Sequence, residues 1–283
     1  MTTAIDGIDH GIFIVRDLDR AAAAYARLGF TVTGLGRHTG LGTGNRLVML
    51  GDDYIELLGV LEPNEYNEPF RACLERREGL WMLALSSSDA AAASVRFRAA
   101  GIPADEPLRF TRPVETPDAK GEAAFCLTRL DAAATPHALM FLLQHFTPDL
   151  VWHPAWQGHE NGALGIGDIT VVVADPAAPA AAYDALFGAG SYTAGAAGPP
   201  LATGRQPIRF VTPAARARRF GAVAAGSPAD GPPCAALSIR VGNAARAAAA
   251  LAANGVPHEV AAGGAVRVAP AHACGAIVEF AAG

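Results

Sequence analysis

A repeated pattern organises this chain of 283 residues. Four segments share one order: an apolar strand, a short polar residue, an alanine-rich helix, and a glycine followed by an apolar residue. The strands are predicted at 11–15, 80–85, 169–173 and 236–241. The helices end at Gly29, Gly101, Gly188 and Gly255, because glycine adopts the left-handed conformation that closes a helix without a Cβ penalty. The pattern predicts an α+β protein built from four similar units.

Each predicted helix is preceded by a residue that can cap it, namely Asp17 or Asp19, Ser88 or Asp89, Asp175, and Asn243. Short strands and turns follow each helix, so that each unit approximates βαβββ. In the first unit the last two strands, 46–50 and 54–58, flank a Gly-Asp-Asp turn typical of a hairpin. Residues 109–122 are predicted to hold an extra loop, and the Gly-, Ala- and Pro-rich stretch 188–204 to form a mobile loop.

Composition and charge exclude several classes of protein. The chain is 51% hydrophobic and 17% charged, which supplies a large core and argues against disorder. The net charge is −5 and no long basic run occurs, so neither nucleic acid nor a membrane is an expected partner. The four cysteines form no CxxC pair. We find no signal peptide or apolar span, and a cytoplasmic location is expected.

The first unit carries residues that are shared with a known family. Asp9-His10 opens its first strand, Val15 to Asp19 leads into the helix, and Asp53 to Leu58 forms its last strand. The other matching stretches are Leu28 to Phe30, Gly36 to His38, Gly42 to Arg46, and His159 to Ala163. Through these residues the chain resembles the vicinal oxygen chelate superfamily in its glyoxalase-like branch.

The resemblance implies that βαβββ units pair and that their sheets curl around a cleft. Two glyoxalase-like, open-barrel domains are then expected, at 1–148 (units one and two) and 165–283 (units three and four), joined by a connection at 149–164. The alternative pairing joins the outer units, one with four and two with three. The sequence leaves both arrangements open.

The resemblance also implies a divalent metal held on the first and last strands of paired units. Imidazole and carboxylate ligands suit Zn, Fe, Mn, Ni or Co. His10 and Glu56 occupy the ligand positions of unit one, and Glu279 lies on the last strand of unit four. The outer-unit pairing brings these three together as a metal site. Sequential pairing leaves only His10 and Glu56, which is half a metal site. The expected cofactor is therefore one of these divalent metals, or there is none.

The polar residues Arg37, His38, Thr43 and Asn45 lie in or beside a glycine-rich turn of unit one. Folds of this kind use the connection near the cleft, and these side chains are predicted to bind substrate; the alternative is an ordinary turn. His159 and Asn161 are further candidates for substrate contact, with anchoring of the connection as the alternative.

Two functions follow. The first is a small-molecule enzyme, a lyase, isomerase or dioxygenase, in which Glu56 is a metal ligand or the general base. The second is a metal-free protein of the bleomycin-resistance type that binds a small molecule in the same cleft. Because the chain contains four units, we expect a monomer or a weak homodimer.

Overall fold

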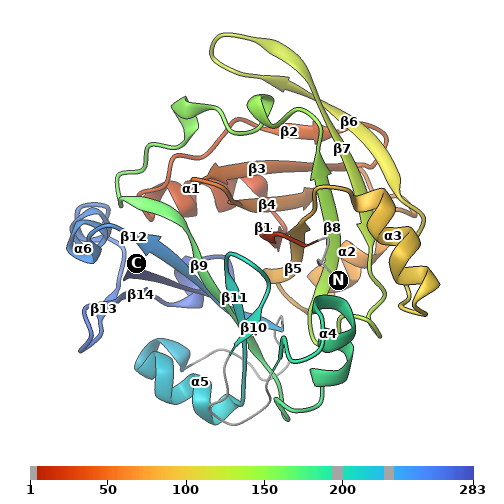
Figure 1. Cartoon of the computed structure of the whole chain (residues 1–283). Helices are drawn as coiled ribbons and strands as arrows, with labels where there is room; N and C mark the ends of the chain where they lie inside the picture. The colour runs from red at the N-terminus through yellow and green to blue at the C-terminus, as the bar shows by residue number, and fades with distance from the viewer. Residues whose placement is uncertain (1–4, 193–199, 226–232) are drawn as a thin grey trace.

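The structure is a computed structural model and describes residues 5–192, 200–225 and 233–283. The predicted order recurs along it, and Figure 1 shows the elements in sequence colours. Unit one contains β1 (Gly7–Val15), α1 (Leu18–Arg27), β2 (Gly36–His38), β3 (Thr43–Met49) and β4 (Tyr54–Val60). After α2 (Glu68–Arg76), unit two contains β5 (Gly79–Ser86), α3 (Ala90–Ala99), β6 (Leu108–Glu115), β7 (Lys120–Arg129) and β8 (Leu139–His145).

The second part of the chain repeats this order with changes. Unit three contains β9 (Ala163–Val172), α4 (Ala180–Phe187), β10 (Leu201–Ala202) and β11 (Pro207–Val211), so that two strands follow its helix in the described residues. An additional helix, α5 (Pro213–Phe220), precedes unit four. That unit contains β12 (Cys234–Val241), α6 (Ala244–Ala253), β13 (Glu259–Val260), β14 (Val266–Val268) and β15 (Ile277–Ala282).

The helix caps agree with the sequence in three units and differ in one. The side chains of Asp17, Asp89 and Asn243 accept hydrogen bonds from backbone N–H groups at the starts of α1, α3 and α6. Asp175 instead accepts from the backbone N–H of Ala177, within a turn, and α4 begins only at residue 180. The prediction that Asp175 caps this helix was therefore wrong.

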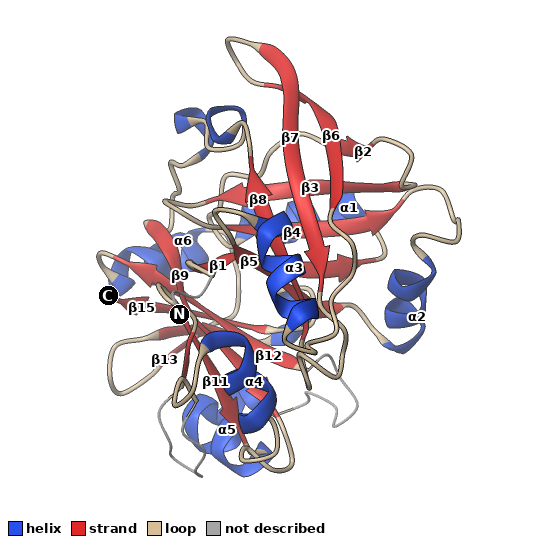
Figure 2. Cartoon of the chain, turned by 45° about the vertical axis from the view of Figure 1, so that its right-hand side comes forward, coloured by secondary structure: helices blue, strands red, loops and turns tan. Residues whose placement is uncertain are grey.

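The predicted extra loop at 109–122 was also wrong, because these residues belong to a β-hairpin. Strands β6 and β7 pair from Leu108↔Leu127 to Glu115↔Lys120, and the hairpin projects from the body of the molecule (Figures 1 and 2). The turn is closed by Thr116, whose hydroxyl accepts the Ala119 N–H. Of the predicted mobile loop at 188–204, residues 193–199 lie outside the described residues.

The sheet places unit one beside unit two and unit three beside unit four. The first strands of units one and two, β1 and β5, run antiparallel, and so do β9 and β12. In all four units, as the structure describes them, the last strand pairs in parallel with the first, as β4 does with β1. We call β1 to β8 the first half and β9 to β15 the second half. A single pairing, Cys234↔Leu80, joins the two halves into one open sheet; the domain boundaries at 148 and 164 stay a prediction.

The largest hydrophobic cluster contains residues of all four units and holds the halves together. Phe30, after α1, stacks on Phe280 of β15 with ring centroids 5.7 Å apart. The Tyr183 hydroxyl of α4 donates to the carbonyl of Pro136 in unit two. A second cluster lies inside the first half. In the described part of the chain no helix is long and apolar enough to cross a membrane.

The contact between the halves can be tested at Gly275. This residue has φ +94°, and a Cβ there would lie 2.4 Å from the carbonyl oxygen of Glu78 in unit two. Gly275→Ala is expected to lower the free energy of unfolding by about 3 kcal/mol or more, because strain and a backbone clash add. Gly255→Ala is the control, since φ is +63° but no atom lies within 4 Å of the added Cβ; about 1 kcal/mol is expected there. Equal losses in urea denaturation would contradict the proposed clash.

Candidate functional site

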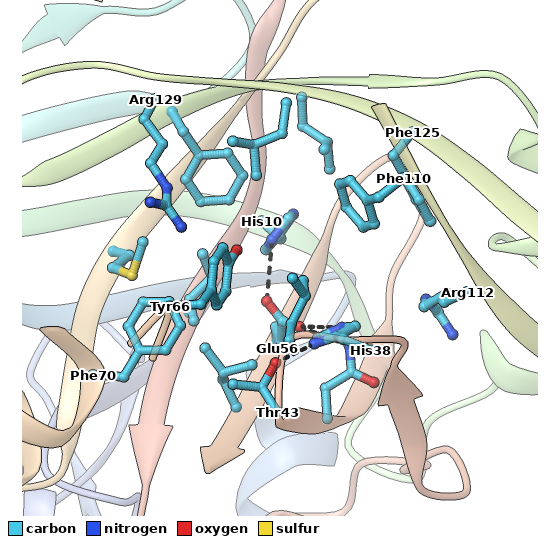
Figure 3. A pocket seen from close by; sticks show the side chains of 18 of the residues that line it. His10, His38, Thr43, Glu56, Tyr66, Phe70, Phe110, Arg112, Phe125 and Arg129 are labelled. Carbon is cyan, nitrogen blue, oxygen red and sulfur yellow. Dashed lines mark hydrogen bonds and ion pairs between the residues drawn. The ribbon is translucent and has the colours of Figure 1, made fainter. Parts of the chain in front are cut away.

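The first half encloses a cavity between its curved sheet and α2, with about 720 Å³ of space when the mouth is included. Successive strand residues point to opposite faces, so alternate residues of β1, β3, β4, β6, β7 and β8 line it. One wall is polar and the opposite walls are aromatic (Figure 3). The polar wall consists of His10, His38, Thr43, Asn45 and Glu56. The aromatic side chains are Tyr54, Tyr66, Phe70, Phe110, Phe125 and Phe141.

Glu56 is the centre of the polar wall. Its Oε1 accepts a hydrogen bond of 2.7 Å from Asn45 Nδ2, and its Oε2 lies 3.4 Å from His10 Nε2. Asn45 Nδ2 is also 3.1 Å from His38 Nε2, and His38 Nδ1 is 2.8 Å from the Thr43 hydroxyl. Because the amide nitrogen Nδ2 can only donate, His38 Nε2 accepts and the proton of His38 lies on Nδ1. Thus His38 is neutral, and His10 supplies the positive charge that faces Glu56.

A second carboxylate lies behind His10. The register of β1 against β5 shifts between Ile8 and His10, and such a bulge re-aims side chains. Asp9 thereby reaches His10 Nδ1 at 2.6 Å and His145 Nε2 at 3.0 Å. Tyr54 stacks on the His10 ring at 4.1 Å. The His10 ring is therefore held by an acceptor on one nitrogen and by an aromatic face.

Burial and pairing oppose one another in this chain of groups. Burial alone would lower the pKa of His10, but its hydrogen bonds to Asp9 and Glu56 outweigh that and raise the pKa to about 9. Burial alone would raise the pKa of Glu56, but the His10 hydrogen bond and charge lower it to about 2. For Asp9, hydrogen bonds to His10 and His145 overcome burial and hold the pKa well below its usual range. Burial lowers the pKa of His38.

The donor set does not fit the metal that the resemblance implied. A resident ion usually takes three or more protein ligands, and in the described ranges no three His, Cys, Asp or Glu side chains are arranged to hold one. His10 and Glu56 face one another, but Glu56 Oε1 is engaged by Asn45 and the other ring nitrogen of His10 by Asp9. No reaction step is therefore assigned to a metal.

The third predicted metal ligand, Glu279, lies in the second half and away from this cavity. Like Glu56, it stands on the last strand of its unit, opposite Ser238 as Glu56 is opposite Ile12. Its carboxylate is ion-paired with Arg219 of α5 at 3.1 Å and with Arg267 at 2.9 Å. It does not meet His10, because unit one pairs with unit two. Glu279 is therefore not retained as a metal ligand.

Arg219 lies among polar side chains of β9, β12 and β15 in the second half. Its guanidinium contacts Asp168 Oδ2 at 2.9 Å, Ser238 Oγ at 3.2 Å and Thr170 Oγ1 at 3.1 Å. The next residue, Phe220, is fully buried with Ala236 and Ile277. In this way α5 supplies both a cation that pairs with Asp168 and Glu279 and an apolar side chain that packs on β12 and β15.

Three residues predicted to bind substrate lie elsewhere. Arg37 is exposed on β2, in a strand whose alternation turns His38 inward. His159 accepts the Thr31 N–H and donates to the Met49 carbonyl, and Asn161 donates to the Leu28 carbonyl. Both are buried and anchor the connection to unit one. We therefore propose neither as a ligand contact.

The cavity also contains residues that the sequence analysis did not select. Arg112 on β6 and Arg129 on β7 line it together with the aromatic side chains. A signal for Arg112 was present, since it interrupts the inward-facing series Phe110, Arg112, Val114 of an alternating strand. The role of His145 gave no such signal, because its pairing with Asp9 bridges 136 residues.

A family model for the glyoxalase-like domain matches residues 8–187, more than half of the chain. The chain belongs to the glyoxalase-like domain family. Membership of the vicinal oxygen chelate fold, predicted from the first unit, is confirmed. No curated protein matches this glyoxalase-like chain.

Two solved structures are similar over almost the whole length. A hypothetical protein from Staphylococcus aureus has 15% identity and a TM-score of 0.66, with 97% of this chain and 98% of that one covered. A mutant of 4-hydroxymandelate synthase from Streptomyces coelicolor has 14% identity and a TM-score of 0.57, with 98% and 92% covered. At these identities the likeness shows the fold alone.

The role of Arg219 can be tested by Arg219→Met. The substitution removes the cation shared by Asp168 and Glu279, which keep Arg209 and Arg267 respectively. Because partners remain and the site is partly exposed, the expected loss of unfolding free energy is about 1–2 kcal/mol. Arg218→Met, at the exposed neighbour, is the control and should change little. Indistinguishable urea midpoints for the two variants would contradict the assigned role.

The charge state of His10 predicts a pH dependence of stability. Its pKa is raised from 6.5 to about 9 in the folded state, so its contribution is complete below pH 6.5 and is lost as pH rises through about 9. Urea denaturation at pH 6.5 and pH 9.5 should show a fall on the order of 3 kcal/mol that is absent in His10→Gln. The same fall in both proteins would contradict the assignment to His10.

Proposed function

We propose that this chain is an enzyme that moves a proton to and from carbon in a small carbonyl compound bound in the first-half cavity. Of the expected reaction classes, isomerase and lyase chemistry require only groups that line this cavity. One observation carries the proposal: the buried His10 and Glu56 pair faces the cavity with its nearest atoms 3.4 Å apart. That separation is longer than a good charged hydrogen bond, which allows a ligand oxygen to replace Glu56 as the partner of His10.

Such an exchange makes Glu56 a stronger base. Burial is the largest influence on its pKa and raises it, whereas the His10 hydrogen bond and charge lower it. A carbonyl oxygen that accepts the His10 Nε2 proton weakens the lowering influence and leaves burial in place. The carboxylate therefore gains affinity for a proton when the substrate is bound. Asn45 keeps Oε1 oriented and leaves Oε2 free to accept.

In the proposed step Glu56 Oε2 takes a proton from the carbon next to the carbonyl, and that C–H bond breaks. The carbonyl oxygen takes the Nε2 proton of His10, and a neutral enol forms. His10 is left neutral and keeps its Nδ1 proton in the hydrogen bond to Asp9, and Glu56 becomes the neutral acid. Glu56 then returns its proton to another carbon, an enol O–H returns a proton to His10 Nε2 and a carbonyl re-forms, which completes an isomerisation. His10 here supplies the electrophilic stabilisation expected of a metal.

The alternative, a metal-free binding protein, is favoured by the aromatic walls. Apolar cavities with a few polar groups are the usual form of a small-molecule site. The two functions share the cavity and differ in whether Glu56 exchanges a proton with the ligand. They are therefore separated by measuring exchange and binding on the same compounds.

The test is deuterium incorporation from D₂O, followed by ¹H NMR, in 2-oxo acids and α-hydroxy ketones that carry one apolar group. The wild-type protein should accelerate exchange next to the carbonyl for at least one compound. Glu56→Gln should slow it by roughly 100-fold or more, as for loss of a general base, and His10→Gln should also slow it. Glu65→Gln, at an exposed carboxylate next in sequence to the cavity residue Tyr66, is the control.

Binding of a compound without exchange above the buffer rate would support the binding protein instead. Elemental analysis of protein purified without chelator provides a separate check. A stoichiometric divalent metal that is lost in both His10→Ala and Glu56→Ala would overturn the metal-free step.

A further inference from the structure

The cavity contains a largely buried cation that forms no ion pair and no hydrogen bond within the described residues. Strand β6 alternates, so Phe110, Arg112 and Val114 face inward while Arg109 is exposed. The Arg112 side chain lines the cavity and is only 9% exposed. Among the described residues its guanidinium has no ion pair and no hydrogen bond. The guanidinium carbon of Arg112 lies over the ring of Phe125, 5.9 Å from the ring centroid.

An unpaired guanidinium in such a place is costly to the fold. Buried charges in proteins are normally paired and hydrogen-bonded, because water that is removed must be replaced by other partners. Arg219 in the second half shows the usual solution, with four oxygen partners from Asp168, Thr170, Ser238 and Glu279. Nothing in the described part of the first half does the same for Arg112. The missing partner is best supplied by a ligand.

The charges around the cavity agree with this. Arg129 also lines it, stacked over Tyr66 at 4.7 Å, and it has no ion pair within the described ranges. Glu56 is the single carboxylate among the described lining residues, and it is already engaged by His10 and Asn45. The cavity therefore carries an excess of positive charge in a chain whose net charge is −5.

We infer that the cavity binds a small monocarboxylate with one flat apolar ring, whose carboxylate pairs with Arg112. A planar guanidinium matches a carboxylate through two parallel hydrogen bonds. Phe110 and Phe125, stacked at 5.0 Å beside Arg112, provide an apolar wall for the ring. The reacting end then faces His10 and Glu56. This last orientation rests on the proposed function, whereas binding of the anion does not.

The test is isothermal titration calorimetry with benzoate, phenylacetate and 3-phenylpropionate, each compared with its neutral amide. The wild-type protein should bind at least one carboxylate more tightly than the matching amide. Arg112→Met preserves length and apolar packing, and should weaken carboxylate binding roughly 10- to 100-fold while leaving amide binding unchanged. Arg109→Met removes an exposed cation from the same strand and should bind as the wild type does.

The melting temperature of Arg112→Met distinguishes a loss of binding from a loss of folding. Arg112→Met should melt at the same temperature as the wild type or higher, since an unpaired buried charge has been removed. If Arg112→Met does not fold, Arg112→Gln and Arg112→Lys replace it, with binding lost in the first and partly kept in the second.

Several outcomes would overturn the inference. These are equal carboxylate binding by Arg112→Met and the wild type, equal binding of acid and amide, or no carboxylate binding at millimolar concentration. Carboxylate binding that depends on Arg112, together with no deuterium exchange in any carbonyl compound, would overturn the proposed function and leave this inference standing.

Discussion

The cavity of the first half depends on a line of three ionised groups, Asp9, His10 and Glu56, enclosed by protein. Burial opposes the charge on each of them, and each is kept charged by its neighbour. His10 in the middle is indispensable, because without its charge two buried carboxylates would face one another across one ring. The bulge in β1, the stack on Tyr54 and the Asn45 amide all serve to hold this ring and the carboxylate beyond it.

The strand arrangement explains why this line ends in a cavity. Parallel pairing of β1 with β4 brings His10 and Glu56 onto one concave wall, and antiparallel pairing of β1 with β5 brings unit two around as the opposite wall. The aromatic side chains of β6, β7 and β8 then face the charged groups. A low-dielectric surrounding strengthens the interaction between any charges that remain. A ligand carboxylate should therefore be attracted to Arg112 more strongly there than in water.

What the sequence could predict follows from the range of the interactions involved. Helix caps such as Asp17 and helix-ending glycines such as Gly29 act over a few residues, and the pattern of four units was readable from them. His10 and Glu56 were predicted as site residues from the resemblance of unit one to a known family. The choice between two unit pairings depends on strand edges far apart in the chain, so the sequence left both open, and only the outer-unit pairing would have placed Glu279 beside His10. Arg112 could have been noticed only by treating 109–122 as a strand, since alternation then shows that it points inward.

The two halves also show what becomes of a carboxylate at one position of a repeated fold. In the second half Glu279 is neutralised from within, by Arg219 and Arg267, and its surroundings are complete before any ligand arrives. The charges of Asp168, Arg219 and Glu279 therefore balance one another without a ligand. Arg112 has no such partner among the described residues, and a ligand from outside completes its surroundings in our proposal. A bound anion should thus stabilise the first half alone, because Arg219 in the second half is already paired with carboxylates.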